Sequence, residues 1–282
     1  MNDVLAALQS ADEETRYQAV RAAQALPAER RLQVGQQALG DEAWRVRKAA
    51  TELLLAHPDR EAVLEIFVAR LGDEANAGAR NAAAEALTAL GAEAVDALHA
   101  VARSRDVDQR KFAADILGEG GAPAAVEPLV ALLDDADVNV RAAAAEALGK
   151  VGDDRARAAL LERVASEDLL VRLSALEGLV RLGAVVPLER LSPLLSERLL
   201  RRPVLRLLAR VETPAALDHL LEAVSDPSPG TREIALASIG TWVQRTGDET
   251  ALRESLAHRD PTPILRAARA ALSGEASAVY GA

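Results

Sequence analysis

The stretch Asp135-Ala136-Asp137-Val138-Asn139-Val140-Arg141-Ala142-Ala143-Ala144-Ala145-Glu146-Ala147-Leu148-Gly149 decides the fold. Ala144 and Leu148 stand three and seven residues after Arg141, so in a helix they lie on one face. The small alanine side chain lets a second helix approach closely. The stretch therefore predicts an amphipathic helix that buries one stripe against its neighbours.

This pattern recurs along nearly the whole chain. Its arginines are 29 to 33 residues apart, a period typical of stacked supersecondary units. They are Arg16, Arg47, Arg80, Arg110, Arg141, Arg172, Arg201 and Arg232. Seven of the eight residues three positions further on are alanine. The period predicts a repeat protein.

Each repeat has signals for the ends of its helices. Six residues before most of the arginines stands an Asp or a Ser, the residue types that cap a helix N-terminus. Glycines follow at eight or eleven residues, where they can end a helix in the left-handed conformation. A second apolar pattern then appears, clearest in Ala125-Val126-x-x-Leu129, and no segment alternates with the period of a strand. Each repeat is therefore predicted to be helix, turn, helix, and the chain all-α.

Composition excludes several classes of protein. The chain has no cysteine, which rules out a disulfide scaffold and a cysteine metal site. Only 2% of its residues are aromatic. Its net charge of −10 argues against a nucleic-acid partner, because phosphate binding needs clustered Lys and Arg. Charged residues interrupt every apolar run, so no membrane span is expected. The N-terminus lacks the features of a signal peptide, and we expect a cytoplasmic protein.

With Asp or Ser, Val-Arg six residues later and then Ala-x-x-Ala-Leu-Gly, the sequence resembles HEAT repeats of the bacterial type also found in phycobilisome lyases. The resemblance covers about residues 10–273. It implies a right-handed α-α superhelix, an α-solenoid of eight to nine helix pairs. We expect a capping half-repeat at residues 1–10, the repeat array at 11–273, and a flexible tail or truncated linker at 274–282. The last repeat, around Asp260 and Arg266, is degenerate.

The resemblance also assigns the repeated Asp and Arg a structural role, as a ladder of charges between neighbouring repeats. The rungs would be Asp41, Asp135 and Asp226 with Arg47, Arg141 and Arg232. Leu195 can neither cap nor pair ionically, whereas the serines at this position, Ser10, Ser104 and Ser166, can cap but cannot pair ionically. Charges held between helices should be paired.

A candidate binding surface lies on the second helix of each pair, which by resemblance lines a concave groove. The two x positions of its Ala-Val-x-x-Leu pattern point away from the core. In five of six repeats at least one of them is Asp or Glu. The predicted partner-binding residues are Glu65, Asp96, Glu127, Glu189, Arg190, Asp218 and His219. A groove of one sign concentrates ligands of the other. The alternative interpretation is an ordinary solvated helix face in an acidic protein.

The few aromatic side chains are also candidates, because aromatic residues often anchor binding surfaces. Trp44 lies near the start of the first helix of its repeat, and Trp242 lies at the end of the first helix of another repeat. Either side chain could cover the edge of a repeat or contact a partner.

No motif for catalysis is present. The four histidines are scattered, with no spacing that places two on one helix face, so we predict no metal site and no cofactor. We predict a non-catalytic scaffold or adaptor that binds a partner protein, with a basic segment as the candidate ligand. Three alternatives stay open: a bilin lyase or isomerase, suggested by the resemblance alone, a nucleic-acid-binding solenoid, and a regulatory arm of a larger multidomain protein. The sequence specifies no oligomeric state.

Overall fold

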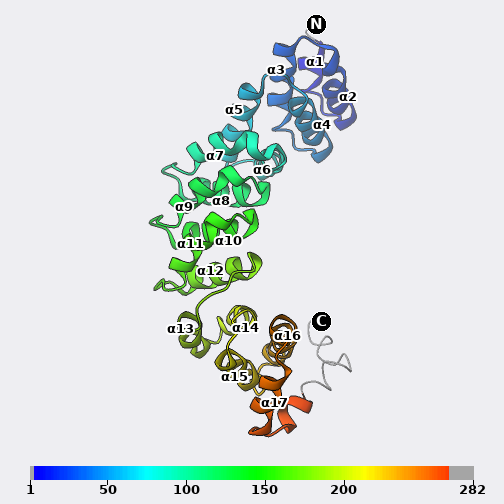
Figure 1. Ribbon diagram of the computed structural model, residues 1–282. Coiled ribbons are helices and arrows are strands. Elements are labelled where there is room, and N and C mark those ends of the chain that lie inside the picture. Colours follow the sequence, from blue (N-terminus) through cyan, green and yellow to red (C-terminus); the bar gives the residue numbers. More distant parts are fainter. Residues whose placement is uncertain (1–2, 267–282) are drawn as a thin grey trace. The chain divides into compact units, whose positions relative to one another are not determined.

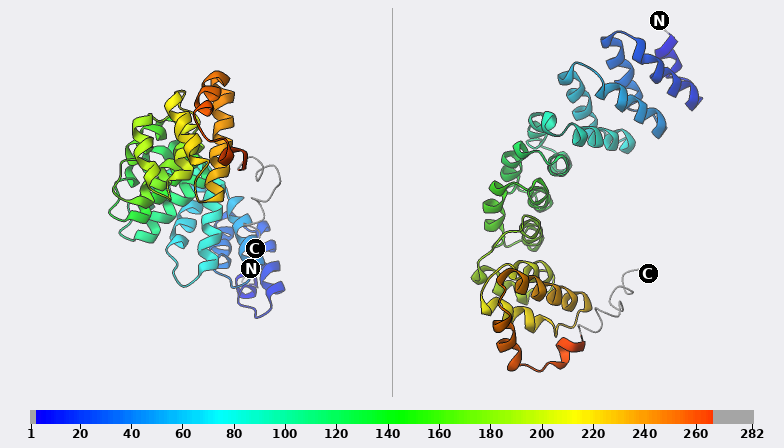
Figure 2. Two further views of the ribbon diagram at one scale, coloured as in Figure 1. Left: turned by 90° about the horizontal axis from the view of Figure 1, so that it is seen from below. Right: turned by 45° about the vertical axis from the view of Figure 1, so that its right-hand side comes forward.

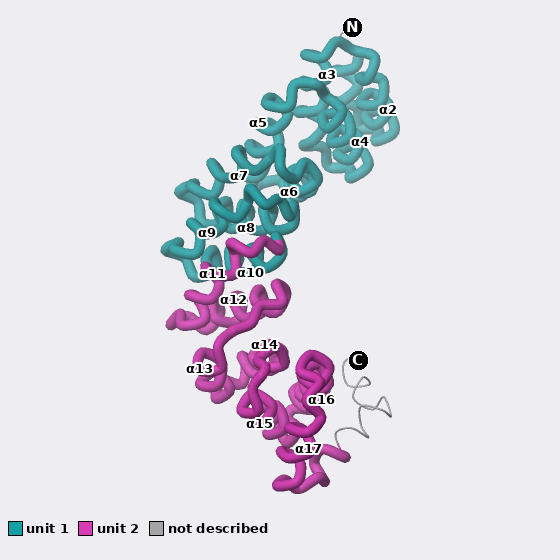
Figure 3. The backbone as a smooth tube through the Cα atoms, in the orientation of Figure 1, with its two compact units in different colours: residues 1–151 teal, residues 152–282 magenta. Residues whose placement is uncertain are grey.

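The computed structural model describes residues 3–266, and every regular element within them is a helix (Figure 1). The chain forms two compact units, residues 1–151 and 152–282 (Figure 3). The predicted tail at 274–282, and residues 267–273 of the degenerate last repeat, lie outside the described residues. The all-α prediction is confirmed for the part of the chain that is described.

The first unit, from residue 3 onward, contains ten α-helices. They are α1 (Asp3–Ala7), α2 (Glu13–Ala22), α3 (Ala28–Ala38), α4 (Trp44–Leu55), α5 (Arg60–Leu71), α6 (Ala77–Leu90), α7 (Val95–Val101), α8 (Val107–Gly120), α9 (Val126–Leu132) and α10 (Val138–Val151). Short 3-10 turns at Ala23–Ala25, Gly91–Ala94 and Pro123–Ala125 lead from one helix to the next. The pairs stack one upon another along the unit (Figure 2).

In the second unit, seven more helices lie wholly within the described residues. They are α11 (Asp154–Arg163), α12 (Leu169–Arg181), α13 (Leu188–Leu191), α14 (Arg201–Leu208), α15 (Pro214–Ala223), α16 (Pro229–Thr246) and α17 (Glu249–Ala257). The repeat around Arg201 is the least regular. Its α13 has only four residues and continues as a 3-10 turn at Ser192–Ser196.

Each unit has two layers. All eight repeated arginines lie on α2, α4, α6, α8 and α10 in the first unit and on α12, α14 and α16 in the second, which we call the arginine layer. Successive helices of this layer pack on one another within each unit. The intervening helices α3, α5, α7 and α9, and α11, α13 and α15, form the second layer and pack against the arginine layer.

The core lies between the layers and follows the repeat pattern. Every small residue three positions after an arginine is buried, and the aliphatic residues at seven positions are buried from Leu54 to Leu208. Ile239 is the exception and is half-buried. The second layer contributes side chains such as Phe67 and Leu129, which are completely buried. Burial at about 25 cal/mol per Å² is therefore spread over every joint, which explains how the fold forms with few aromatic residues.

The predicted N-caps are displaced by two residues. In α8 the cap is Asp106, whose carboxylate accepts the N–H of Asp108, whereas the Ser104 hydroxyl accepts the N–H of Asp106. The same displacement gives α2 its cap at Asp12 rather than Ser10. The residue six positions before the arginine therefore stabilises the turn that precedes the cap. Its short polar side chain accepts a hydrogen bond from the backbone N–H two residues later.

The glycine prediction is right at eleven residues and wrong at eight. Gly121 ends α8 with φ 62°, the left-handed conformation. Gly118, eight residues after Arg110, lies buried inside α8. A Cβ on Gly118 would stand 2.6 Å from the Cβ of Ala147 on α10. Glycine is needed there for the close approach of two helices, which the sequence pattern does not distinguish from a helix end.

Candidate functional site

The repeated charges meet at the joints between neighbouring repeats. Arg16 on α2 donates from Nε to Asp41 Oδ2 at 2.7 Å and from a terminal nitrogen to Asp41 Oδ1 at 3.0 Å. Both side chains are more than nine-tenths buried. The same guanidinium donates to the carbonyls of Ser10 and Ala11. A two-pronged contact of this kind fixes geometry as well as adding energy.

The arrangement recurs at two further joints. Arg110 binds both carboxylate oxygens of Asp135, at 2.7 and 2.9 Å, and Arg201 lies 2.8 Å from Asp226. Each carboxylate also accepts the backbone N–H two residues on. At each of these joints one carboxylate therefore contacts both the arginine of the preceding repeat and the backbone of its own turn.

The residues of the expected ladder use backbone contacts within a repeat and ion pairs between neighbouring repeats. Arg47, Arg141 and Arg232 donate to the backbone carbonyls of Asp41, Asp135 and Asp226 respectively. The carboxylates of those aspartates pair with the arginine of the preceding repeat. Each Asp–Arg step therefore links the turn of one repeat to the helix of the repeat before it.

These contacts change the acidity of the aspartates. The Arg110 guanidinium lowers the pKa of Asp135 below its ordinary value, and the N–H of Asp137 adds to the effect. Burial alone would raise the pKa of Asp41, but hydrogen bonds from Arg16 and from the N–H of Ala43 outweigh it and the pKa is lowered. Hydrogen bonds to the charged form favour it, so both carboxylates are ionised at neutral pH.

Other joints lack the aspartate. Arg80 has a serine at the position where Arg110 has Asp135, and its Nε is buried without a hydrogen-bond acceptor among the described residues. Its guanidinium instead lies over the Phe112 ring, 5.2 Å from the centroid. The Nε of Arg172, which has Leu195 at the same position of the pattern, is also buried without an acceptor in that part of the chain.

The predicted binding residues of the first unit lie on the second layer. Glu65, Asp96 and Glu127 are on α5, α7 and α9. All three are exposed, and none forms an ion pair with another described residue. They stay predicted binding residues.

Most of the predicted binding residues of the second unit form hydrogen bonds or ion pairs, unlike those of the first unit. Glu189 is exposed, but Arg190 donates to the carbonyl of Leu161 at 3.1 Å. Asp218 forms an ion pair with Arg259 at 3.0 Å. The His219 ring lies 3.7 Å from Glu222. Of this group, Glu189 alone is exposed and makes neither an ion pair nor a side-chain hydrogen bond inside residues 3–266.

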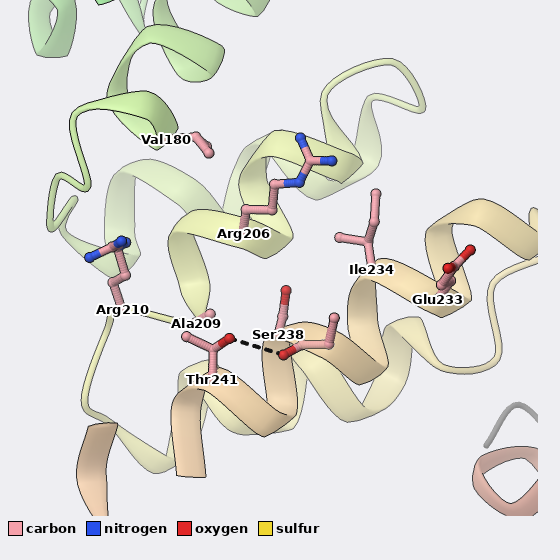
Figure 4. Close-up of a pocket in the computed structure, with 9 residues that line it drawn as sticks. Val180, Arg206, Ala209, Arg210, Glu233, Ile234, Ser238 and Thr241 are labelled. Carbon is pink, nitrogen blue, oxygen red and sulfur yellow. Dashed lines mark hydrogen bonds between the residues drawn. The ribbon is translucent and has the colours of Figure 1, made fainter. Parts of the chain in front are cut away.

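Two of the grooves on the described residues open on the arginine layer, whereas His219 lines a separate cavity with Arg201 and Asp226. In the first unit a groove of about 370 Å³ separates α4 from α6. In the second unit a groove of about 360 Å³ lies between α14 and α16, with Arg206, Ser238 and Thr241 in its lining (Figure 4). Thr241 donates back to the carbonyl of Ala237 on its own helix. The predicted acidic row lies outside both grooves and stays a prediction.

The α4–α6 groove contains a residue of a kind common at binding sites. Trp44 is 65% exposed, and the Lys48 ammonium stands 5.2 Å from its ring. Glu52, from α4, and Glu85, from α6, also line the groove. Trp44 was a candidate from the sequence, whereas the two glutamates were missed. The available signal was an acid five residues after the repeated arginine, at Glu52, Glu85, Asp115, Glu146 and Glu177.

Trp242 and His57 have structural surroundings. Trp242 is buried and its indole N–H donates to the carbonyl of Val211 at 2.8 Å. His57 is buried, and its Nδ1 accepts the N–H of Asp59. The ring proton is therefore on Nε2, which donates to the carbonyl of Ala28 at 3.0 Å. Both side chains have their polar atoms satisfied inside the fold.

The His, Asp and Glu side chains of the described residues are too dispersed to form a metal site. No group of three or more of them among residues 3–266 is placed to hold a metal ion. No helix of that segment is both long and apolar enough to cross a bilayer. The absence of catalysis and of a cofactor stays a prediction.

Comparison with known proteins defines the class. The chain matches the family of HEAT repeats over residues 1–88 and 95–180, which together are more than half of its length. The chain therefore belongs to the HEAT repeat family. No curated protein matches it significantly.

Solved structures share this fold at low sequence identity. Importin beta has a TM-score of 0.60 at 16% identity over 96% of this chain and 46% of its own. Kap121p, in a complex with Nup53p, has a TM-score of 0.56 at 15% identity over 91% of this chain and 35% of its own. The Escherichia coli protein YibA has a TM-score of 0.47 at 18% identity, over 86% of this chain and 91% of its own. This chain spans less than half of the length of the first two. The first two likenesses establish the α-α solenoid fold.

Proposed function

We propose that this protein is a non-catalytic scaffold or adaptor that binds a partner protein along the exposed faces of its repeats. The observation that carries the proposal is a set of exposed acidic side chains at repeating positions on packed helices, together with the exposed Trp44. Kap121p, which has a similar fold, is bound to the protein Nup53p. A solenoid of this type therefore serves as a protein-binding surface elsewhere.

The energetics favour this type of recognition. Helices held by a buried core lose little conformational freedom when they bind, so modest contacts repeated from unit to unit sum to a useful affinity. Each repeat contributes one or two side chains, such as Glu65 on α5 and Glu127 on α9.

The charge of the protein favours a basic partner. The net charge is −10, and Glu65, Asp96 and Glu127 have no cation within residues 3–266 to neutralise them. Complementary charge speeds encounter and selects among partners more than it adds raw affinity. A basic segment is therefore the proposed partner chemistry. We also propose that the repeats are of the bacterial type, as the sequence resemblance implies, and that the protein acts in the cytoplasm.

Affinity capture from the native lysate, followed by mass spectrometry, tests the proposal. Glu65, Asp96 and Glu127 are changed together to lysine, and the bound proteins are compared with those of the wild type. The control changes three exposed acids outside the second layer, Glu74, Glu167 and Glu254, to lysine. A basic protein that is captured by wild type and control and lost by the first variant supports the acidic row. Equal capture by both variants contradicts it.

A further inference from the structure

A buried hydroxyl without a hydrogen-bond partner lies in the wall of the α14–α16 groove. Ser238 of α16 is only 3% exposed, and its Oγ makes no hydrogen bond with any described residue. Figure 4 shows this hydroxyl pointing from α16 towards α14, into the groove. Buried polar groups in folded proteins are normally hydrogen-bonded, so an unpaired one requires an explanation.

No other repeat has a polar side chain at the position of Ser238. This position lies six residues after the repeated arginine, and in the other repeats it is occupied by Ala22, Leu53, Ala86, Ile116, Ala147, Gly178 and Leu207. The packing of one repeat on the next therefore needs no hydroxyl here. The Ser238 hydroxyl is available to a ligand in the groove.

Two arginines project from the opposite wall. Arg206 lies in the last turn of α14 and Arg210 in the turn that follows, and both line the groove together with Ser238 (Figure 4). Arg210 makes no ion pair and no side-chain hydrogen bond with a described residue. Its guanidinium packs on the turn after α12, where a Cβ on Gly183 would stand 3.2 Å from both terminal nitrogens. This guanidinium is therefore held beside the groove with its donors unused.

The nearby carboxylates compensate little of this positive charge. Arg206 lies 3.5 Å from Glu177, but the two side chains are 46% and 42% exposed, and such an exposed pair contributes little. Glu233 also lines the groove, but Figure 4 shows it at the opposite end from Arg210. The acidic excess of the chain falls almost wholly within residues 1–151, whereas acidic and basic residues are nearly equal in number in residues 152–282. An anion beside Arg210 therefore meets more positive than negative charge.

We propose that the α14–α16 groove binds a small phosphate monoester. The two guanidinium groups and the Ser238 hydroxyl supply donors for the three terminal oxygens of the phosphate, which carries a charge of about −1.5 to −2 at pH 7. The planar fork of each arginine can bond two of these oxygens at once. The site lies outside the proposed acidic row and adds a ligand to the proposed scaffold function.

The rest of the groove suits the organic part of such a ligand. Val180, Ala209 and Ile234 provide apolar surface beside the three donor groups. The volume of the groove, about 360 Å³, lies within the range of small-molecule sites, about 300–1,000 Å³. A monoester with an apolar body is therefore expected to bind more tightly than inorganic phosphate.

Titration of phenyl phosphate into the whole chain tests the site. Binding is followed at physiological ionic strength by the NMR signals of the backbone amides, and those of Arg210 and Ser238 are expected to shift. Arg210→Gln should weaken binding at least about tenfold, because it removes hydrogen bonds to a charged group. Ser238→Ala should weaken binding severalfold. This variant should fold normally, since alanine occupies the same position in other repeats, as Ala86 and Ala147.

The matched control is Arg198→Gln, which removes the charge of an exposed arginine of the same unit that does not line the groove. Loss of affinity in the Arg210 and Ser238 variants but not in the control supports the site. Equal weakening by the control, or shifts confined to other helices, would show non-specific attraction and overturn the proposal.

Two further ligands test the chemistry. Benzoate has an apolar body like that of phenyl phosphate but offers only two oxygens and one charge, so it should bind more weakly. Benzoate that binds as tightly, or phenyl phosphate that does not bind, overturns the proposal. The peptide Gly-Ala-phosphoserine-Ala-Gly is titrated alongside. If this peptide binds and phenyl phosphate does not, the ligand is a phosphorylated protein segment and the assignment to a small molecule is wrong.

Discussion

Arg110 and Asp135 face each other across the joint between α8 and α10 and form two hydrogen bonds of 2.7 and 2.9 Å. The same guanidinium donates to the carbonyls of Ser104 and Arg105, and the same carboxylate accepts the N–H of Asp137. One pair therefore ties together a helix, the turn before it and the turn of the next repeat. This makes the pair a structural element of the stack.

Asp135→Ala should lower the free energy of unfolding by about 3 kcal/mol, because removing one partner leaves the other charge buried and unpaired. Urea unfolding followed by circular dichroism measures the change. The control is Asp115→Ala, which removes an exposed pair with Lys111 and should cost less than about 1 kcal/mol. If both variants lose the same free energy of unfolding, the Arg110–Asp135 pair contributes no more than an exposed ion pair.

Stability should fall in acid for the same reason. The pKa of Asp135 and that of Asp41 are lower in the folded protein than their ordinary values. Their contribution is therefore fully present above the pKa of an unfolded aspartate, about 3.9, and is lost as the pH falls through the lower folded values. Urea melts between pH 7 and pH 2 should show this decline. A double Asp41→Asn, Asp135→Asn variant should be less stable at pH 7 and lose less on acidification, and an unchanged pH profile would count against this assignment.

The two tryptophans should behave in opposite ways. Trp242→Ala should destabilise by about 3–5 kcal/mol, because it empties a buried site and leaves the Val211 carbonyl without its donor. Trp44→Ala should change stability by less than about 0.5 kcal/mol, because the side chain is exposed. Acrylamide should quench Trp44 far more than Trp242. Similar quenching in the two single-tryptophan variants would contradict the different burial of the two side chains.

Gly118→Ala should weaken the packing of α8 on α10. Its Cβ would stand 2.6 Å from that of Ala147, so the helices must separate, at a cost of about 1–3 kcal/mol. Gly120→Ala is the matched control, since its nearest neighbours would stand at an ordinary 3.6 Å. If thermal melts show the two variants to be equally stable, the close approach at Gly118 is not required.

The repeated sequence predicts the helix pairs and their buried faces because both follow from local periodicity. Residues such as Ala144 and Leu148 can be placed in the core from spacing alone. The N-caps are displaced by two residues because Asp and Ser fit both the cap and the turn before it. Gly118 is wrongly predicted because a glycine inside a helix and one at its end look alike without knowledge of the neighbouring helix.

The candidate site is harder to predict. Glu65 and Asp96 can be predicted as exposed acids because the period of the apolar residues identifies the face of a helix that points away from the core. The relation between Glu52 and Glu85 depends on how two neighbouring helices are registered against each other. That register becomes visible only in three dimensions, where the ion pair Arg21–Glu52 shows which positions meet. Asp218, predicted as a free binding residue, is neutralised by Arg259, 41 residues further along the chain.

The affinity of the captured partner for a charge-reversed protein tests the central claim most directly. In this variant Glu65, Asp96 and Glu127 are all changed to lysine, and its circular dichroism is compared with the wild type to show that it folds. We predict that the dissociation constant of the partner rises at least a hundredfold. A partner that binds the folded variant as tightly as the wild type would contradict recognition through an acidic face of these repeats.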